Sequence, residues 1–162
     1  MSLELFIIRD AAPGDEYAVQ EVVFAVLREY GLTPDAHGPA ADLEDLQAAY
    51  PRCGGVFRVI TDPAGCIVGC GGLRPAAGGD VELRKMYLLP EARGQGLGKR
   101  LLEELIAAAR AGGHRRIVLD TASVLKEAIA LYRKRGFQPY ENPNRVRRCD
   151  QSLVLQIIEA TG

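Results

Sequence analysis

The sequence lacks the residue patterns that hold a metal ion or a disulfide framework. Its 162 residues include four cysteines and two histidines, and no two cysteines form a C-x-x-C pair. His37 and His114 lie far along the chain from any cysteine, which argues against a zinc site. A chain of this length can bury a core without cross-links, so we expect neither a metal nor disulfide bonds.

Long apolar runs and an excess of one charge are also missing. No run approaches the roughly 20 apolar residues that a membrane-spanning helix needs, and the N-terminal segment lacks the basic start and apolar core of a signal peptide. Lys and Arg number 20 against 21 Asp and Glu. This balance gives no electrostatic reason to expect nucleic acid or an anionic membrane as a partner. Because neither a signal peptide nor a membrane-spanning run is recognised, we expect a cytoplasmic protein.

The spacing of apolar residues predicts one α/β domain over residues 1–162, with a mixed sheet and no internal repeat. Strands are predicted over residues 5–8, 54–62, 66–74, 81–89, 117–119, 137–141 and 153–158. Helices are predicted over residues 15–30, 42–50, 97–111 and 125–135. Asp42 is the expected N-cap of the second helix. The second and third strands form a hairpin about Asp62–Gly65, and the third helix joins two parallel strands.

The strand that begins at Val81 changes phase along its length. Val81 and Leu83 are apolar at odd positions, whereas beyond Lys85 the apolar residues Met86 and Leu88 occupy even positions. A one-residue slip of this kind is typical of a β-bulge, which redirects backbone groups near functional sites. A regular strand is the alternative, because two further apolar residues fit the original phase.

A glycine-rich loop, Arg93–Gly98, joins this strand to the third helix. Its small residues leave backbone N–H groups uncovered, and the start of the helix adds unpaired donors and the positive end of the helix dipole. An anionic group such as phosphate fits there. The spacing excludes the P-loop, because Arg93 replaces its first glycine and Arg100 follows Lys99. It also excludes G-x-G-x-x-G, because the glycines alternate.

Two motifs resemble those of the GCN5-related N-acetyltransferase (GNAT) superfamily. The segment Tyr87–Gly98 is similar to its acyl-coenzyme A pyrophosphate motif, with R-x-x-G-x-G between a strand and a helix. The segment Ala130–Phe137 is similar to the L-Y-x-x-x-G-F end of the helix after the superfamily's fifth strand. The resemblance covers nearly the whole chain. It implies a single α/β (α+β) domain with a mixed, mostly antiparallel sheet of six to seven strands, a splayed parallel pair and about four helices.

The resemblance further implies that acetyl-coenzyme A is the cosubstrate. Its pantetheine arm would pair with the strand before the loop, at Met86, Tyr87 and Leu88. Its pyrophosphate would bind the amides of Arg93, Gly94, Gln95, Gly96, Leu97, Gly98 and Lys99. Tyr132 would also contact the cosubstrate. An exposed loop arginine without a ligand is the alternative interpretation of Arg93.

Two catalytic residues are implied by the same resemblance. Tyr132 would donate a proton to the departing coenzyme A thiolate, and Glu82 would take a proton from the amine. Tyr132 also continues the apolar stripe of its helix, so a packed core tyrosine is the alternative. Glu82 is alternatively a solvated carboxylate or the ion-pair partner of Arg84. Direct transfer in a ternary complex needs no nucleophile, so Cys149 is interpreted as structural.

The superfamily builds its acceptor cleft from segments that correspond here to residues 30–41 and 142–151. Arg145, Arg147 and Arg148 in the second segment either hold an acidic group of the acceptor or face water. We predict acetyl transfer to a primary amine of a small molecule or amino acid by a monomer or homodimer. A protein N-terminal or lysine acetyltransferase and a non-enzymatic acyl-coenzyme A-binding module are the alternatives.

Overall fold

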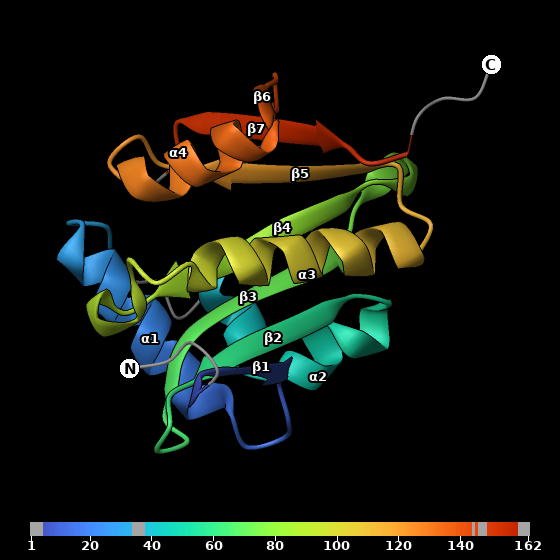
Figure 1. Ribbon diagram of the computed structural model, residues 1–162. Helices are drawn as coiled ribbons and strands as arrows, with labels where there is room; N and C mark the ends of the chain where they lie inside the picture. The colour runs from blue at the N-terminus through green and yellow to red at the C-terminus, as the bar shows by residue number, and fades with distance from the viewer. Residues whose placement is uncertain (1–4, 34–37, 144, 146–148, 159–162) are drawn as a thin grey trace.

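The computed structural model describes residues 5–33, 38–143, 145 and 149–158, and places their strands in one mixed sheet (Figure 1). The strands are β1 Ile7–Asp10, β2 Val56–Thr61, β3 Ile67–Pro75, β4 Val81–Leu88, β5 Arg116–Thr121, β6 Gln138–Pro139 and β7 Gln151–Gln156. Their order across the sheet is β1-β2-β3-β4-β5-β7-β6. β4 and β5 are parallel and the other neighbours are antiparallel. The predicted mixed, mostly antiparallel sheet is confirmed.

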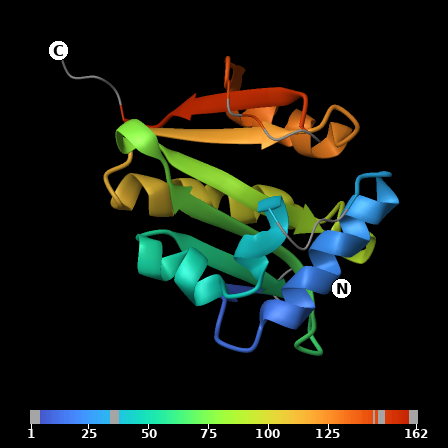
Figure 2. The ribbon, with the colours of Figure 1, turned by 180° about the vertical axis from the view of Figure 1, so that it is seen from behind.

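Helices cover both faces of this sheet. The α-helices of the described chain are α1 Glu16–Glu29, α2 Leu46–Ala49, α3 Leu97–Ala111 and α4 Lys126–Arg135. α3 and α4 lie in front of the sheet in Figure 1, whereas α1 and α2 are in front in Figure 2. Each face buries its own apolar cluster, one around Leu101 and Leu105, the other around Val23 and Leu46. None of these helices has the length and apolar character to cross a membrane.

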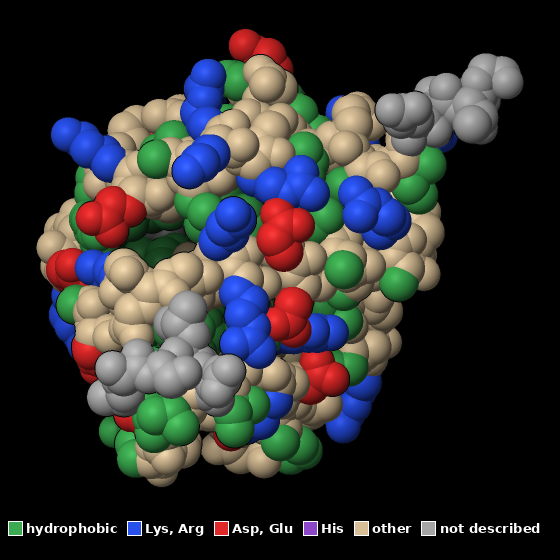
Figure 3. Space-filling view, in the orientation of Figure 1, with side chains coloured by type: hydrophobic (Ala, Val, Ile, Leu, Met, Phe, Trp, Pro, Cys, Tyr) green, Lys and Arg blue, Asp and Glu red, His purple; other side chains and the backbone are tan. Residues whose placement is uncertain are grey.

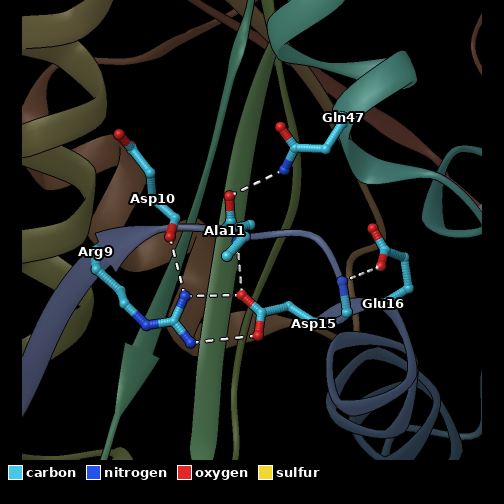
Figure 4. Close-up of polar contacts among 8 residues, drawn as sticks. Arg9, Asp10, Ala11, Asp15, Glu16 and Gln47 are labelled. Carbon is cyan, nitrogen blue, oxygen red and sulfur yellow. Dashed lines mark hydrogen bonds and ion pairs between the residues drawn. The ribbon is translucent and has the colours of Figure 1, made fainter.

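Side chains at the corner between β1 and α1 hold these elements and α2 together (Figure 4). Asp15 accepts hydrogen bonds from the Arg9 guanidinium at 2.7 and 3.3 Å, and from the Ala12 N–H at 2.7 Å. The hydrogen bond from Arg9 lowers the pKa of Asp15. Gln47 of α2 donates to the Ala11 carbonyl at 3.0 Å. α2 is therefore hydrogen-bonded directly to the segment that precedes α1.

Asp42 does not cap α2, so that prediction is wrong. Asp45 is the N-cap and accepts a hydrogen bond from the Ala48 N–H at 3.1 Å. Asp42 is instead buried, where it accepts a hydrogen bond from the Tyr50 hydroxyl and lies 3.1 Å from the Lys85 ammonium. A buried ammonium requires a counter-ion. The sheet brings that ammonium to residue 42 from a distant part of the chain, which local spacing does not reveal.

The β-bulge predicted in β4 is present. The register between β3 and β4 steps from Gly72–Arg84 to Cys70–Tyr87, so one residue of β3 opposes two residues of β4. Lys85, within the bulge, has a left-handed φ of 56°. The apolar side chains on both sides of the bulge pack into the α3-facing cluster, namely Val81, Leu83, Met86 and Leu88.

β4 and β5 are paired only where they begin. Their register covers Val81–Ile117 and Glu82–Val118, after which the strands diverge toward the glycine loop, as Figure 1 shows. Beyond Glu82, the edge of β4 that faces β5 therefore has no strand partner in the described chain. Backbone groups on such an edge are available to pair with a ligand.

Candidate functional site

A cavity of about 720 Å³ lies where β4 and β5 diverge. Its wall is formed by β4, the glycine loop, the first turn of α3, the end of β5, α4, and segments that follow α1 and β6. Figure 3 shows the hollow at the left of the molecule, with hydrophobic side chains in its depth. A concave site of this size, assembled from segments far apart in the sequence, can enclose a small-molecule ligand.

The glycine loop contributes backbone groups rather than side chains to this cavity. Gly94 and Gly96 have φ values of 75° and 80°, which strain any residue with a Cβ. Gly96 is also the N-cap of α3, so the first N–H groups of this 15-residue helix have no capping side chain. Uncapped donors at the positive end of a helix favour an anion. This conformation is compatible with the anion site that the sequence predicts, and anion binding at the loop stays a prediction.

Most of the predicted contact residues line the cavity, and two do not. Those that line it are Met86, Tyr87, Leu88, Arg93, Gly94, Gly96, Gly98, Lys99 and Tyr132. The Gln95 amide instead donates to the Glu91 carbonyl at 3.0 Å, and the Leu97 side chain is buried in the core beneath α3. Gln95 and Leu97 can therefore meet a ligand in the cavity through their backbone only.

The Arg93 side chain makes hydrogen bonds to α1 and β4 and does not extend freely into solvent. Its guanidinium donates to both carboxylate oxygens of Glu29 at 2.7 and 2.8 Å, and its Nε donates to the Leu88 carbonyl at 2.9 Å. The guanidinium also lies 5.6 Å from the centre of the Tyr30 ring. The hydrogen bonds between the two side chains raise the pKa of Arg93 and lower the pKa of Glu29. Arg93 thus joins the end of α1 to the end of β4.

Glu82 lines the cavity and forms an ion pair at the same time. Its carboxylate lies 3.2 Å from the Arg84 guanidinium, and its side chain is 32% exposed. Burial raises the pKa of Glu82, with Arg84 opposing this effect and Asp120 adding to it. A carboxylate with a raised pKa in a cavity is a candidate proton acceptor. Glu82 therefore lines the cavity while it is paired with Arg84.

Tyr132 reaches the cavity from α4. Its side chain is 5% exposed and its ring packs against Phe137, with 5.6 Å between the ring centres. Burial raises the pKa of Tyr132, so the phenol keeps its proton at neutral pH. Its hydroxyl makes no hydrogen bond with any residue that the structure describes. Tyr132 therefore has a ring that packs in the core and a protonated hydroxyl that can donate a proton.

Asp120 and Tyr140 also line the cavity, and sequence reasoning missed both. Asp120 lies near the end of β5, where it interrupts the apolar run Ile117–Leu119. A carboxylate at that position was the signal that could have identified it. Burial raises the pKa of Tyr140, and the charges of Asp120 and Glu82 raise it further. These three side chains therefore lie within electrostatic reach of one another.

Some described residues of the two segments predicted to form the acceptor cleft line the cavity, whereas residues 34–37 of the first segment lie outside the described part of the chain. Tyr30 and Leu32 of the first segment line it, as do Asn142 and Cys149 of the second. Arg145 is exposed and does not line the cavity. Arg147 and Arg148 lie outside the described residues, so the predicted acidic-acceptor contact stays a prediction.

No disulfide joins the four cysteines, all of which lie in the described part of the chain. Among the residues that the structure describes, no group of three or more His, Cys, Asp or Glu side chains is arranged to hold a metal ion.

The chain is similar to known acetyltransferases in sequence and in fold. A profile of the Acetyltransferase (GNAT) family matches residues 21–137. The uncharacterized N-acetyltransferase YjgM of Escherichia coli K12 is 41% identical over 129 residues, or 76% of this chain and 77% of that protein. An acetyltransferase of the GNAT family from Staphylococcus aureus Mu50 shares the fold with a TM-score of 0.89 at 20% identity, over 94% of this chain and 99% of its own. A GNAT-superfamily phosphinothricin acetyltransferase from Sinorhizobium meliloti, in complex with acetyl-coenzyme A, has a TM-score of 0.77 at 24% identity, over 97% and 91% of the two chains.

The matching fold agrees with the sequence relationship. The family profile covers most of the described residues, including the glycine loop and Tyr132. The E. coli relative extends the relationship over three quarters of both chains. The chain belongs to the acetyltransferase (GNAT) family and is an N-acetyltransferase.

Proposed function

We propose that this N-acetyltransferase moves the acetyl group of acetyl-coenzyme A directly to a primary amine of a small molecule or amino acid within a ternary complex. One observation carries the proposal. A single cavity joins an anion-binding loop, a carboxylate with a raised pKa and a buried tyrosine. The complex of the S. meliloti neighbour with acetyl-coenzyme A supports the choice of cosubstrate.

In this proposal, the backbone holds acetyl-coenzyme A at two places. The amides of residues 93–99 bind its pyrophosphate at the start of α3. The open edge of β4 at Met86, Tyr87 and Leu88 pairs with its pantetheine amides, as an added strand would. The pairing of β4 with β5, which in the described chain covers only Val81 and Glu82 of β4, supports this arrangement. The thioester is thereby directed toward the part of the cavity that contains Glu82 and Tyr132.

The chemistry uses Glu82 as the base and Tyr132 as the acid. Glu82 accepts a proton from the ammonium of the acceptor, and the resulting amine nitrogen attacks the thioester carbonyl carbon. The carbon–sulfur bond then breaks while Tyr132 gives its proton to the sulfur. The second proton of the nitrogen restores the Tyr132 hydroxyl, and Glu82 releases the proton that it accepted to solvent. An ammonium and acetyl-coenzyme A thus yield an amide, coenzyme A and one proton.

A panel of primary amines, with release of coenzyme A as the readout, tests the proposal. Turnover with a small amine or amino acid is expected, together with a thermal shift on addition of acetyl-coenzyme A. Turnover with protein N-termini or lysines alone would contradict the assignment of a small acceptor. Tight binding of acetyl-coenzyme A without turnover of any amine would contradict the proposed catalysis.

Gly96→Ala is expected to weaken acetyl-coenzyme A binding about tenfold, because a left-handed φ costs a residue with a Cβ about 1–2 kcal/mol. Nothing lies within 4 Å of the added Cβ, so strain and not collision moves the loop amides. Isothermal titration with acetyl-coenzyme A measures the change.

Gly65→Ala is the matched control for that prediction. Gly65 has a φ of 86°, and a Cβ there also meets nothing within 4 Å, but it lies in the turn between β2 and β3 outside the cavity. The two variants should lose similar stability. An equal loss of acetyl-coenzyme A affinity in both would show that the loop at Gly96 has no special part in binding.

Cys149→Ser is expected to retain kcat within about twofold, because direct transfer forms no acetyl-enzyme. The test is needed because Cys149 lines the cavity. Mass spectrometry of the wild-type protein mixed with acetyl-coenzyme A should detect no acetylated cysteine. A covalent acetyl group on Cys149, together with an inactive serine variant, would replace the ternary-complex route by a two-step route.

We also infer that residues 1–162 form a single domain, which is supported by one sheet that includes strands from both ends of the chain. The predicted monomer or homodimer and the cytoplasmic location stay predictions.

A further inference from the structure

Asp120 has no part in the acid–base chemistry proposed above, yet it lies in the wall of the same cavity. Val118 of β5 pairs with Glu82 of β4. Because side chains alternate along a strand, Asp120 lies on the same face of the sheet as Glu82. Val81 and Ile117, which alternate with them, pack on the α3 side. The two carboxylates therefore share the face opposite α3, on either side of the point where β4 and β5 diverge.

The hydrogen-bond partners of Asp120 are all neutral. The Asn142 amide donates to its two oxygens at 2.9 and 3.1 Å, and the Ser152 hydroxyl donates at 2.7 Å. These bonds orient the carboxylate without neutralising it, and it forms no ion pair with any described residue.

Two other carboxylates of the cavity wall are already compensated. Glu82 lies 3.2 Å from the Arg84 guanidinium, and Asp80 lies 2.7 Å from the Arg116 guanidinium. Asp120 is thus an oriented negative charge without a cation among the described residues. A partly buried charge of this kind is stabilised by a cationic ligand.

We propose that Asp120 binds the protonated amine of the acceptor and holds its nitrogen beside Glu82. This inference rests on the proposed function and adds the form in which the acceptor binds, as a primary ammonium. The ammonium pairs with Asp120, transfers one proton to Glu82, and leaves its nitrogen free to attack the thioester. Ser152 and Asn142 are positioning residues, because they act through the orientation of Asp120. The charge of Asp120 also raises the pKa of Glu82, which agrees with the position of both carboxylates in one cavity wall.

Asp120→Asn is expected to raise the KM of an ammonium acceptor at least about tenfold, the scale of a hydrogen bond to a charged group. The affinity for acetyl-coenzyme A should not change, because its binding groups lie in the loop and β4. An asparagine oxygen can still accept hydrogen bonds from Ser152 and Asn142. The substitution therefore removes the charge and keeps the two hydrogen bonds to Oδ1, and it loses only the 3.1 Å contact between the Asn142 amide and Oδ2.

The charge of the acceptor separates recognition from structural support. An aromatic amine that is neutral at the assay pH makes no ion pair, so its KM should change less than about twofold in Asp120→Asn. A structural role would raise the KM of neutral and charged acceptors equally, and that result would overturn the proposal. Asp120→Glu should restore part of the affinity for the ammonium acceptor.

Asp150→Asn is the matched control. Asp150 also joins neighbouring segments through neutral donors, since it accepts hydrogen bonds from the N–H and hydroxyl of Ser123 at 2.8 and 2.6 Å. It does not line the cavity, so the KM of the ammonium acceptor should be unchanged.

The outcomes distinguish this inference from the proposed function. Normal acetylation by the wild-type protein with an unchanged KM in Asp120→Asn overturns the role of Asp120 and leaves the proposed function standing. A wild-type protein that acetylates no amine overturns the proposed function and this inference with it.

Discussion

Tyr132→Phe is expected to bind acetyl-coenzyme A with wild-type affinity and to release coenzyme A at least ~100-fold more slowly, the scale of a lost general acid. The substitution removes only the hydroxyl, because a phenylalanine ring keeps the packing against Phe137. Since burial raises the pKa of Tyr132, the wild-type phenol is protonated at neutral pH. It can therefore supply the proton that the departing sulfur requires.

The stability of the same variant separates a catalytic tyrosine from a packing tyrosine. The Tyr132 hydroxyl has no hydrogen-bond partner among the described residues, so its removal strands no buried group. The free energy of unfolding should change by less than about 1 kcal/mol. Single-turnover kinetics, acetyl-coenzyme A titration and urea unfolding measure the three quantities. A fall in turnover of less than ~10-fold would leave Tyr132 as a core residue only.

Glu82→Gln is expected to lower turnover with an ammonium acceptor by at least ~100-fold. Glutamine keeps the size of the side chain and can accept a hydrogen bond from Arg84, which lies 3.2 Å from Glu82. It cannot take the proton of the amine. Acetyl-coenzyme A affinity is expected to stay at the wild-type value, which an isothermal titration checks.

The pH dependence of kcat tests the same residue. Burial is the largest cause that raises the pKa of Glu82. The base must be deprotonated to act, so the wild-type rate should rise with pH through a value above the ordinary glutamate pKa of about 4.3. This acidic limb should disappear in Glu82→Gln. The same limb in both proteins would mean that another group is the base.

The raised pKa of Glu82 also sets the sign of its contribution to stability. A carboxyl group whose pKa is higher in the folded state than in the unfolded state binds its proton more tightly when folded. Its contribution to stability is therefore lost as the pH rises above the unfolded pKa. At neutral pH, Glu82→Gln should not lower Tm. A marked fall in Tm would favour the interpretation of Glu82 as a structural partner of Arg84.

Local patterns predicted the type and order of the strands and helices. The residues at which strands begin and end differ from the prediction, because pairing with neighbouring strands determines them. β1 was expected over residues 5–8 but includes Arg9 and Asp10, because both pair with β2. β7 begins at Gln151 and not at residue 153, because Gln151 and Ser152 pair with β5. A strand extends as far as its hydrogen-bonded partner does, whatever the polarity of its side chains.

Features formed by consecutive residues were readable from the amino-acid sequence. The glycine spacing before α3, the L-Y-x-x-x-G-F motif and the change of phase at Lys85 each depend on neighbours in the chain. Backbone conformation at a helix start or a bulge follows from those neighbours, so the family and the bulge could be predicted.

The Glu82–Arg84 ion pair, between residues two apart, was one of the alternatives read from the sequence, but partners that are distant in the chain could not be predicted in this way. Arg93 extends to Glu29 of α1, Asp42 neutralises a buried ammonium of β4, and Asp120 shares a cavity with Glu82. Each of these arrangements joins segments that become neighbours only when the sheet order is established. The energy of a charge depends on its burial and on the charges around it in space. The tertiary structure therefore decides that Asp42 pairs with a buried ammonium, that Asp120 is oriented by neutral donors, and that Glu82 has a raised pKa.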